Sequence, residues 1–323
     1  MSIKGLMRLS LRVALITSPL AAAHAQGYPD KLITIVVPFP AGSATDTLAR
    51  TVGKGITELS GQNVVVQDLP GANGVLAVEK VAKSRPDGYT ILLGTHTTQS
   101  ANQWLLKNMP YDPVKDFEPV SALAKGWSFL LVNPKSPIKS VDDLVAKAKK
   151  APGTLTYGGG GATSRVSVEM FAQRKGLKFL YVGYKGNSDA INDLIGGRLD
   201  FMISDMVTAL PQIKAGRLRA LAFTGTKRSP SAPNVPTFNE AGVPGYEHTY
   251  WQAVYVPSGT PATVVTKLNT LLHKAMELDT AKKYLKTNGL ARFLTTPEEL
   301  AKFQQEQTKM IGEVVRRAGI EPM

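Results

Sequence analysis

The amino-acid sequence predicts an α/β fold with a largely parallel sheet. From residue 33 onward, short apolar runs alternate with helical patterns, as in strands that are covered by helices. Two turns of small residues, near 38–46 and 158–165, each lead from an apolar run into a helical pattern. No repeat is present at solenoid periods. These observations favour an α/β architecture with two similar strand-to-helix turns.

The first turn lies in the stretch 33–50, where an apolar run stops at two prolines and a helix follows. Five small residues fill the turn and leave its main chain accessible: Ala41, Gly42, Ser43, Ala44 and Thr45. The first N–H groups of a helix have no intrahelical acceptor, so they and the helix dipole favour a carboxylate or phosphate. Ser43 and Thr45 add hydroxyls, and Asp46 is expected to cap the helix or hold the loop.

The second turn lies in the stretch 155–171 and has the same design. A strand pattern is followed by four glycines and then by small and hydroxyl-bearing residues that open an amphipathic helix. The candidate ligand-binding residues of this turn are Gly161, Ala162, Thr163 and Ser164. Two such turns in one chain predict two lobes that close on one ligand.

The order of the remaining elements divides the chain into lobes. The predicted strands are 33–37, 64–66, 91–94, 129–132, 155–157, 179–182, 199–203, 218–223 and 250–256, and helices are predicted at 75–83, 144–149 and 187–195 and from 261 and 297 onward. We expect the chain to cross to a second lobe near residues 117–124. The first lobe is therefore predicted over 26–124 and 251–323, and the second over 125–250.

Residues 1–25 are predicted to be a secretory signal peptide. They have a basic start, an apolar middle and a small-x-small end at Ala23-His24-Ala25. The apolar run is too short for a spanning helix, and the chain has no cysteine for a lipid anchor or a disulfide. The predicted location is the periplasm, without an anchor.

The charge balance is basic but spread along the sequence. The chain has 38 Lys and Arg against 25 Asp and Glu, and removal of the three basic residues of the signal leaves a net charge of +10. No long basic block with interleaved aromatic residues is present, so no nucleic-acid partner is predicted. We interpret the charge as a solvated surface that raises the local concentration of small anions.

Four further residues are candidates for the binding site. His96 and Asp205 follow predicted strands, where polar side chains of parallel sheets face the ligand crevice. Phe39 and Trp251 could form an apolar wall against an aromatic acid, or belong to the core. The predicted mature chain has three histidines without metal-binding spacing, so neither a metal nor a cofactor is predicted.

The same residues argue against catalysis. The chain has no Cys nucleophile, Gly-x-Ser-x-Gly elbow, phosphate-binding Gly-Lys loop or His-Glu-x-x-His motif. The alternative function is a secreted α/β hydrolase or lyase in which Ser43 or Ser164 acts with His96. The effector domain of a cytoplasmic regulator is a third possibility, and the predicted signal peptide and the lack of a helix-turn-helix argue against it.

Six runs spread over the chain resemble those of the Bug proteins, the periplasmic substrate-binding components of tripartite tricarboxylate transporters. The runs are 28–33, 37–46, 111–117, 184–186, 193–201 and 257–261. The resemblance implies a type II periplasmic-binding-protein fold with two lobes joined by two crossing segments. It also implies a monomer that binds a small organic carboxylate and delivers it to a membrane permease. The expected carboxylate is a dicarboxylate or an aromatic acid. The carboxylate would lie between the two turns, held by main-chain N–H groups and ordered water.

The chain departs from the family pattern at two positions. Many members have Gly-Gly in the first turn, where this chain has Gly42-Ser43 and gains a hydroxyl. Members commonly have a histidine where this chain has Arg165, which would place a fixed positive charge with a bidentate fork near the site. The alternative is a solvent-facing arginine on the first turn of the helix, where the dipole disfavours a cation.

Overall fold

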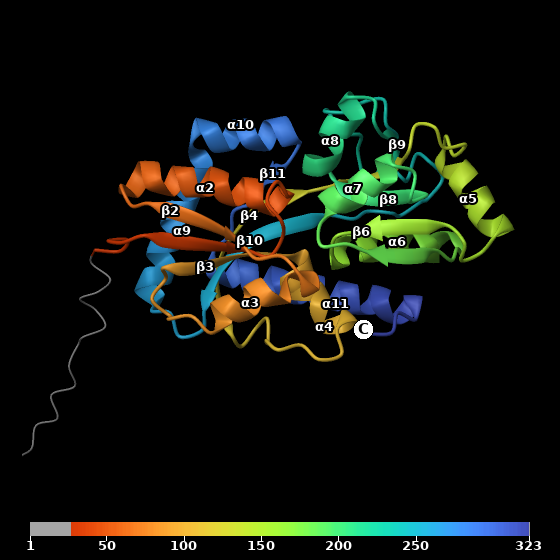
Figure 1. Cartoon of the computed structure of the whole chain (residues 1–323). Helices are drawn as coiled ribbons and strands as arrows, with labels where there is room; N and C mark the ends of the chain where they lie inside the picture. The colour runs from red at the N-terminus through yellow and green to blue at the C-terminus, as the bar shows by residue number, and fades with distance from the viewer. Residues whose placement is uncertain (1–26, 323) are drawn as a thin grey trace, which may run out of the picture.

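The computed structural model describes residues 27–322, which form two mixed β-sheets side by side along the long axis of the molecule (Figure 1). The predicted signal peptide, residues 1–25, lies outside the described residues. No helix in the described part of the chain is both long and apolar enough to cross a membrane.

The first sheet has six strands, and its parallel part is smaller than predicted. In spatial order the strands are β11 (Ala291–Arg292), β4 (Phe117–Gly126), β10 (Tyr250–Pro257), β3 (Thr90–Thr95), β1 (Ile33–Val37) and β2 (Val64–Asp68). β1 is parallel to β2 and β3, whereas β10 is antiparallel to both β3 and β4. The carboxyl ends of β1 and β3 therefore meet the amino end of β10 at one edge.

The second sheet has five strands and the same mixed character. In spatial order these are β7 (Leu180–Gly183), β6 (Thr156–Gly159), β8 (Phe201–Asp205), β5 (Ser128–Val132) and β9 (Arg219–Phe223). β6 is parallel to β7 and β8, and β5 is antiparallel to β8 and β9. The carboxyl ends of β6, β7 and β8 lie at one edge of this sheet.

Residues 117–124, where the sequence analysis expects the crossing, lie within a strand. β4 runs for ten residues through this region and remains in the first sheet as far as Gly126. The chain changes sheets at Trp127, because β5 begins at Ser128, and it returns between Phe223 and Tyr250. The sequence analysis did not predict a strand here, because Glu118 and Pro119 interrupt the apolar pattern. The proline fits in the strand because register shifts interrupt the pairing of β4 with β10.

Helices cover both faces of each sheet. The first sheet is flanked by α2 (Ala44–Ser60), α3 (Val75–Ala82), α9 (Ala262–Glu277) and α10 (Asp279–Asn288), and the second by α5 (Val141–Lys150), α6 (Ala162–Lys175), α7 (Asn187–Ile195) and α8 (Met206–Lys214). Three short helical segments lie between the longer elements: η1 (Ala72–Gly74), η2 (Thr97–Ala101) and α4 (Asn102–Leu105). The sequence analysis missed α8, which contains Pro211.

The helix starts follow the capping chemistry of the sequence. The side chains of Ser43 and Ser140 accept hydrogen bonds from N–H groups three residues later. Thr296 and Glu299 form a complete capping box at the start of α11 (Pro297–Ala318).

Helix α11 contributes to the cores of both sheets. Leu300, near its start, belongs to the apolar cluster on one face of the first sheet. Ile311 and Val315, near its end, belong to a cluster of the second sheet, together with residues of α6. The side chain of Gln173 on α6 also donates a hydrogen bond to the carbonyl of Val314, at 2.8 Å. The last helix therefore ties the two halves of the molecule together.

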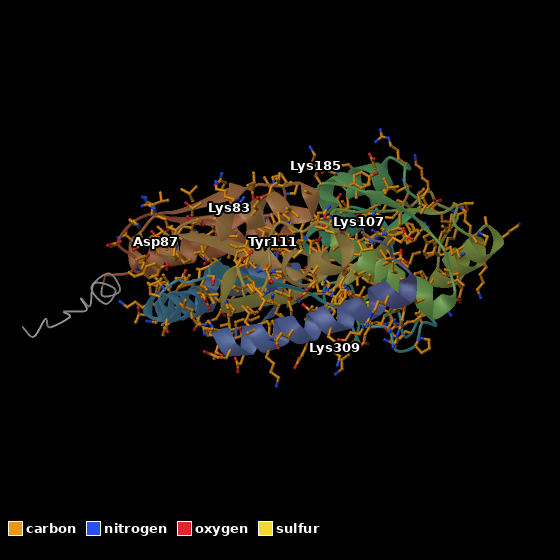
Figure 2. The ribbon with its side chains drawn as sticks, turned by 90° about the horizontal axis from the view of Figure 1, so that it is seen from below. Lys83, Asp87, Lys107, Tyr111, Lys185 and Lys309 are labelled. Carbon is orange, nitrogen blue, oxygen red and sulfur yellow. The ribbon has the colours of Figure 1, made fainter. Side chains whose placement is uncertain are left out.

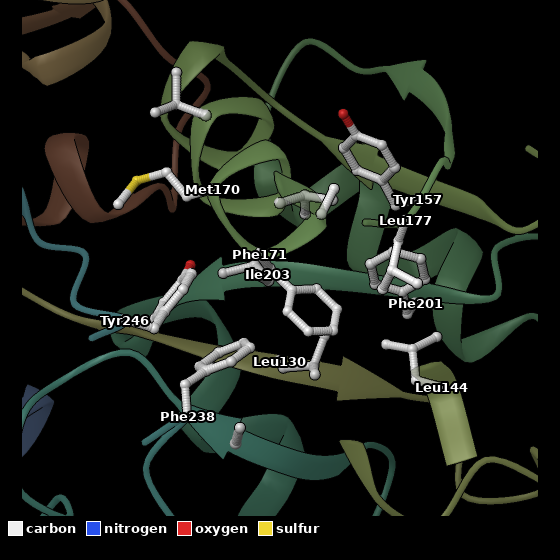
Figure 3. Packing of buried hydrophobic residues seen from close by; sticks show 14 of the residues in the cluster. Leu130, Leu144, Tyr157, Met170, Phe171, Leu177, Phe201, Ile203, Phe238 and Tyr246 are labelled. Carbon is white, nitrogen blue, oxygen red and sulfur yellow. The ribbon is translucent and has the colours of Figure 1, made fainter. Parts of the chain in front are cut away.

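Aromatic side chains fill this core of the second sheet (Figure 3). Tyr157 of β6 stacks on Phe201 of β8, with ring centroids 5.7 Å apart. Phe171 of α6 meets Phe238 edge-on at 5.4 Å. The cluster fixes α6, and with it the second turn, against the sheet.

We expect Ile311→Ala to lower the free energy of unfolding by about 2–5 kcal/mol, because it opens a cavity in a core that both halves share. Met310→Ala is the matched control, since the neighbouring Met310 is 37% exposed. Urea unfolding of both variants tests this expectation. Equal losses of stability would contradict the placing of Ile311 in the core.

Candidate ligand-binding site

A pocket lies between the two sheets, at the edge where their strand ends meet. The centre of a water molecule can occupy a volume of about 70 Å³ in this pocket. This is room for a few water molecules or a small organic ion. The lining residues come from both sheets: Phe39, Ser43, Ala44, Thr45, Thr95, Thr97, Ser128, Gly160, Gly161, Thr163, Ser164, Gly186, Asn187, Asp205, Thr208, Tyr250, Trp251 and Gln252.

The first turn presents the start of α2 to the pocket. The main-chain N–H of Gly42 donates to Oδ2 of Asp46 at 2.8 Å, and Gly42 adopts a left-handed conformation with φ of 78°. Asp46 therefore holds the loop, as one of the two predicted roles requires. The N–H groups of Ala44 and Thr45 have no partner in the described part of the chain. These two donors remain available to a ligand.

Asn187 organises the second turn. Its Oδ1 accepts hydrogen bonds from the N–H of Gly160, at 2.9 Å, and from the hydroxyl of Ser164, at 3.1 Å. The packing is close, because a Cβ on Gly160 would lie 2.1 Å from the backbone carbon of Gly186. The glycine at position 160 is required for this contact between the turn and α7.

Two further helices begin at the pocket, and the sequence analysis did not assign them to the site. Gly186 and Asn187 stand at the start of α7, and Asp205 caps α8 through a 2.9 Å hydrogen bond from the N–H of Thr208. The amino ends of α2, α6, α7 and α8 thus converge on one cavity. Each end carries a partial positive charge, so together they favour an anion.

Hydrogen bonds join the two sheets directly beside the pocket. The hydroxyls of Thr97 and Thr163 are 2.9 Å apart, and the N–H of Thr163 donates to Oγ1 of Thr97 at 3.3 Å. Nδ1 of His96 is 3.2 Å from the same Thr163 hydroxyl. The end of β3 is therefore bonded to the first turn of α6, and the two halves are in contact.

The pocket wall lacks a cationic side chain among the described residues. Asp205 is its single formally charged residue, and its carboxylate accepts bonds from Asn187 Nδ2 at 2.8 Å and Thr208 Oγ1 at 2.9 Å. Anion attraction here comes from main-chain N–H groups and helix ends instead of from Lys or Arg.

The wall formed by β10 combines aromatic surface with free polar atoms. Tyr250 and Trp251 line the pocket, as Phe39 does. Trp251 Nε1 and Gln252 Oε1 are buried and have no hydrogen-bond partner among residues 27–322. Buried polar atoms are costly unless they are bonded, so a ligand or ordered water is expected to contact them.

Two buried histidines stand behind this wall. The rings of His96 and His248 meet edge-on with centroids 5.6 Å apart, and His96 also meets Trp251 at 6.4 Å. Burial lowers the pKa of His96 to about 3, with the nearby His248 adding to the effect, and burial lowers the pKa of His248 to about 4. Both imidazoles are neutral at pH 7.

Most of the predicted site residues come together at the pocket. Nine of them line it: Phe39, Ser43, Ala44, Thr45, Gly161, Thr163, Ser164, Asp205 and Trp251. Four lie outside its wall. Gly42 shapes the first turn, Ala162 packs in the core of the second sheet, and His96 stands behind Thr163.

Arg165 is the fourth. Its guanidinium carbon lies 5.1 Å from the centre of the Tyr181 ring of β7, on a side of α6 that does not line the pocket. The helix turns by about 100° per residue, so Arg165 and Ser164 point in different directions.

Nine lining residues were not among the candidate binding residues of the sequence analysis: Thr95, Thr97, Ser128, Gly160, Gly186, Asn187, Thr208, Tyr250 and Gln252. Most of them share a signal, because they stand at strand ends or helix starts that meet at the crevice.

The geometry gives no support to the hydrolase alternative. Ser43 caps α2, and the Ser164 hydroxyl donates to Asn187, while His96 contacts Thr163. Neither serine is hydrogen-bonded to the histidine. Among residues 27–322 no group of three or more His, Cys, Asp or Glu is placed to hold a metal ion.

Sequence comparisons connect the chain to a family of transport receptors. Residues 48–320 match the family described as "Tripartite tricarboxylate transporter family receptor". The chain is 35% identical to the UPF0065 protein of the tcbD-tcbE intergenic region of a Pseudomonas species, over 93% of this chain and 90% of that protein. It is 33% identical to BugT of Bordetella pertussis, over 93% of each chain.

Structure comparisons agree with the sequence matches. Rpa4515 of R. palustris, solved with adipate, is 35% identical and superposes with a TM-score of 0.88 over 92% of this chain and all of that one. The periplasmic binding protein BugD gives a TM-score of 0.86 at 31% identity, over 92% of this chain and all of that one. MatC of Rhodopseudomonas palustris with bound malate gives 0.84 at 30% identity, over 89% of this chain and all of that one. The predicted two-part α/β binding-protein fold is confirmed.

The two buried histidines lead us to expect a loss of stability in mild acid. Below pH 6.5 the unfolded chain binds protons at both imidazoles, whereas the native state stays neutral down to about pH 4 for His248 and about pH 3 for His96. Their stabilising effect is complete above pH 6.5 and declines as the pH falls, by roughly 2 kcal/mol per histidine at pH 5.

Urea unfolding at pH 7 and pH 5 measures this loss. In the double variant His96→Asn/His248→Asn the difference between the two pH values should shrink by several kcal/mol, whatever its stability at pH 7. An undiminished pH dependence would show that other groups bind the protons.

Proposed function

Because the chain belongs to the family of tripartite tricarboxylate transporter receptors, we propose that it is a periplasmic solute-binding receptor that captures a small organic carboxylate between two lobes. The observation that carries this proposal is the convergence of four helix amino ends on a pocket without Lys or Arg among its described wall residues. Such a pocket binds an anion through neutral donors.

The relatives support the chemical class of the ligand. Two solved relatives hold adipate and malate, both dicarboxylates. The pocket also has an aromatic side formed by Phe39, Tyr250 and Trp251. We therefore propose a dicarboxylate or an aromatic acid, with one carboxylate at the N–H groups of Ala44 and Thr45.

The proposed function as a receptor also implies where the protein works and how the ligand passes through it. The proposed signal peptide directs the chain to the periplasm, where the lobes close by bending at the segments that link them: residue 127, residues 224–249 and helix α11. The monomeric receptor then passes the anion to a membrane permease. Binding is reversible, and the bound acid leaves chemically unchanged.

We expect a panel of carboxylates to contain at least one acid that raises the melting temperature. A ligand at a hundred times its Kd stabilises the native state by about 2.7 kcal/mol. Thermal shift with adipate, malate, succinate and hydroxybenzoates makes the first test, and calorimetry confirms the hits. A panel without any stabilising acid, or a new product seen by mass spectrometry, would contradict the receptor function.

Two substitutions separate the residues that shape the pocket from those beside it. Arg165→Ala should leave the affinity for the identified acid within a few tenths of a kcal/mol, because its guanidinium stacks on Tyr181. Asn187→Ala should weaken binding about tenfold, because it removes buried hydrogen bonds to Gly160, Ser164 and Asp205.

Asn192→Ala is the matched control, since Asn192 is an exposed residue of the same helix. Calorimetry gives all three affinities. A tenfold or larger loss for Arg165→Ala would bring Arg165 into ligand contact, which is one of the two alternatives left open by the sequence analysis.

A further inference from the structure

The fold gathers basic residues that are scattered in the sequence. The edge of the second sheet that faces away from the pocket is formed by the amino ends of β6, β7, β8 and β9 and the carboxyl end of β5. The loops at this edge, counted together with the helix ends that lead into them, are 133–140, 147–155, 174–179, 196–200 and 214–219. We call this edge the basic pole. It lies at the end of the molecule where Figure 1 shows α5.

Hydrogen bonds and an ion pair hold these loops side by side. The N–H of Gly153 donates to the carbonyl of Lys178 at 3.0 Å, and Lys147 pairs with Asp200 at 3.5 Å. Arg219 donates to the carbonyl of Pro134, and Asn133 Nδ2 donates to the carbonyl of Ile195, both at 2.8 Å. The five loops therefore form one continuous surface.

The charge of this surface is strongly one-sided. The five loops carry twelve Lys and Arg and one acid, Asp200, and ten of the twelve basic residues are exposed. Asp142, Asp143 and Asp193 lie beside them and leave an excess of eight positive charges. The excess is close to the whole net charge of +10 calculated for residues 26–323.

The opposite end of the molecule has no such excess. The loops at the outer edge of the first sheet are 28–32, 61–63, 84–89, 112–116 and 258–261. They carry three basic and four acidic residues. Figure 2 shows one of the acids, Asp87, at this end of the molecule. The molecule is therefore electrically polar along its long axis.

We propose that the basic pole docks the protein onto an anionic phospholipid surface. Eight of the twelve basic residues are lysines, whose compact ammonium groups suit diffuse attraction more than bidentate recognition. The centres of protein–protein interfaces are depleted in lysine and rich in aromatic anchors. Among the described residues, Leu180 is the one exposed large hydrophobic side chain at these strand ends. Clustered lysines without apolar anchors fit lipid headgroups better than a protein partner.

This docking leaves the pocket free. The basic pole and the pocket lie at opposite edges of the same sheet, because the parallel strands that end at the pocket begin at the pole. A receptor held by this pole keeps its ligand entrance away from the bilayer, so the docked state is one that captures ligand and that the receptor leaves before the transfer proposed above. The proposal does not depend on which carboxylate is bound.

Vesicle cosedimentation tests the proposal on protein purified from the periplasm. Vesicles of one part phosphatidylglycerol to two parts phosphatidylcholine should bind the protein at about 50 mM salt and release it at about 500 mM, because salt screens the attraction. Pure phosphatidylcholine vesicles should not bind it. The variant Lys149→Gln/Lys150→Gln/Lys178→Gln should bind at least tenfold more weakly.

The matched control is Lys283→Gln/Lys286→Gln/Lys302→Gln, which removes the same charge from exposed positions on α10 and α11. It should change vesicle binding less than twofold. Equal losses in both variants would show that net charge alone drives binding, and the pole would carry no docking role. Absence of binding to the anionic vesicles at low salt would also overturn the proposal and leave an acidic protein surface as the occupant.

Discussion

The unpaired N–H groups at helix starts are the constraint on which the rest of this structure depends. Four helices begin at the carboxyl ends of strands, and each would bury main-chain donors without acceptors if the pocket stayed empty. Side-chain oxygens of the protein accept hydrogen bonds from some of these N–H groups. The Asp46 carboxylate accepts from Gly42, the Asn187 amide oxygen accepts from Gly160, and the Thr97 hydroxyl accepts from Thr163. The N–H groups of Ala44 and Thr45 are among the donors that remain, and an anion can accept hydrogen bonds from them. A cationic side chain is unnecessary in such a site, and its absence from the described wall avoids the cost of burying a further charge.

The contact between Thr97 and Thr163 connects the binding chemistry to the conformation of the whole molecule. These hydroxyls come from different sheets, so they can meet when the two halves are closed. His96 adds a third member from the first sheet, and its burial against His248 and Trp251 keeps the imidazole neutral. The observed arrangement of the two halves therefore has hydrogen bonds of its own. In the closure that we propose, a ligand supplies the remaining difference in free energy between the open and closed states.

The sequence analysis succeeded where local chemistry decides the structure. Thr296 stands before a helix with Glu299 placed to complete the capping box, and the small residues of the first turn leave its main chain accessible to a ligand. It failed where distant segments decide. Asn187 contacts a turn 27 residues earlier in the chain, and no local pattern marks that contact. The direction of Arg165 depends on how α6 rotates against β7, which the packing of the core sets. The sequence also did not predict the basic pole, because its five loops are distant in the sequence and the order of the strands brings them together.

Helix α11 has a consequence for the order in which this protein can fold. Ile311 and Val315 complete the core of the second sheet, although the strands of that sheet lie between residues 128 and 223. A chain that crosses a membrane with its amino end first delivers these two residues almost last. Until they arrive, the second sheet lacks part of its apolar cover, and contacts of such long sequence separation form slowly. In the export that we propose, the chain would therefore stay incompletely folded during its passage, in the extended form that a translocation channel accepts.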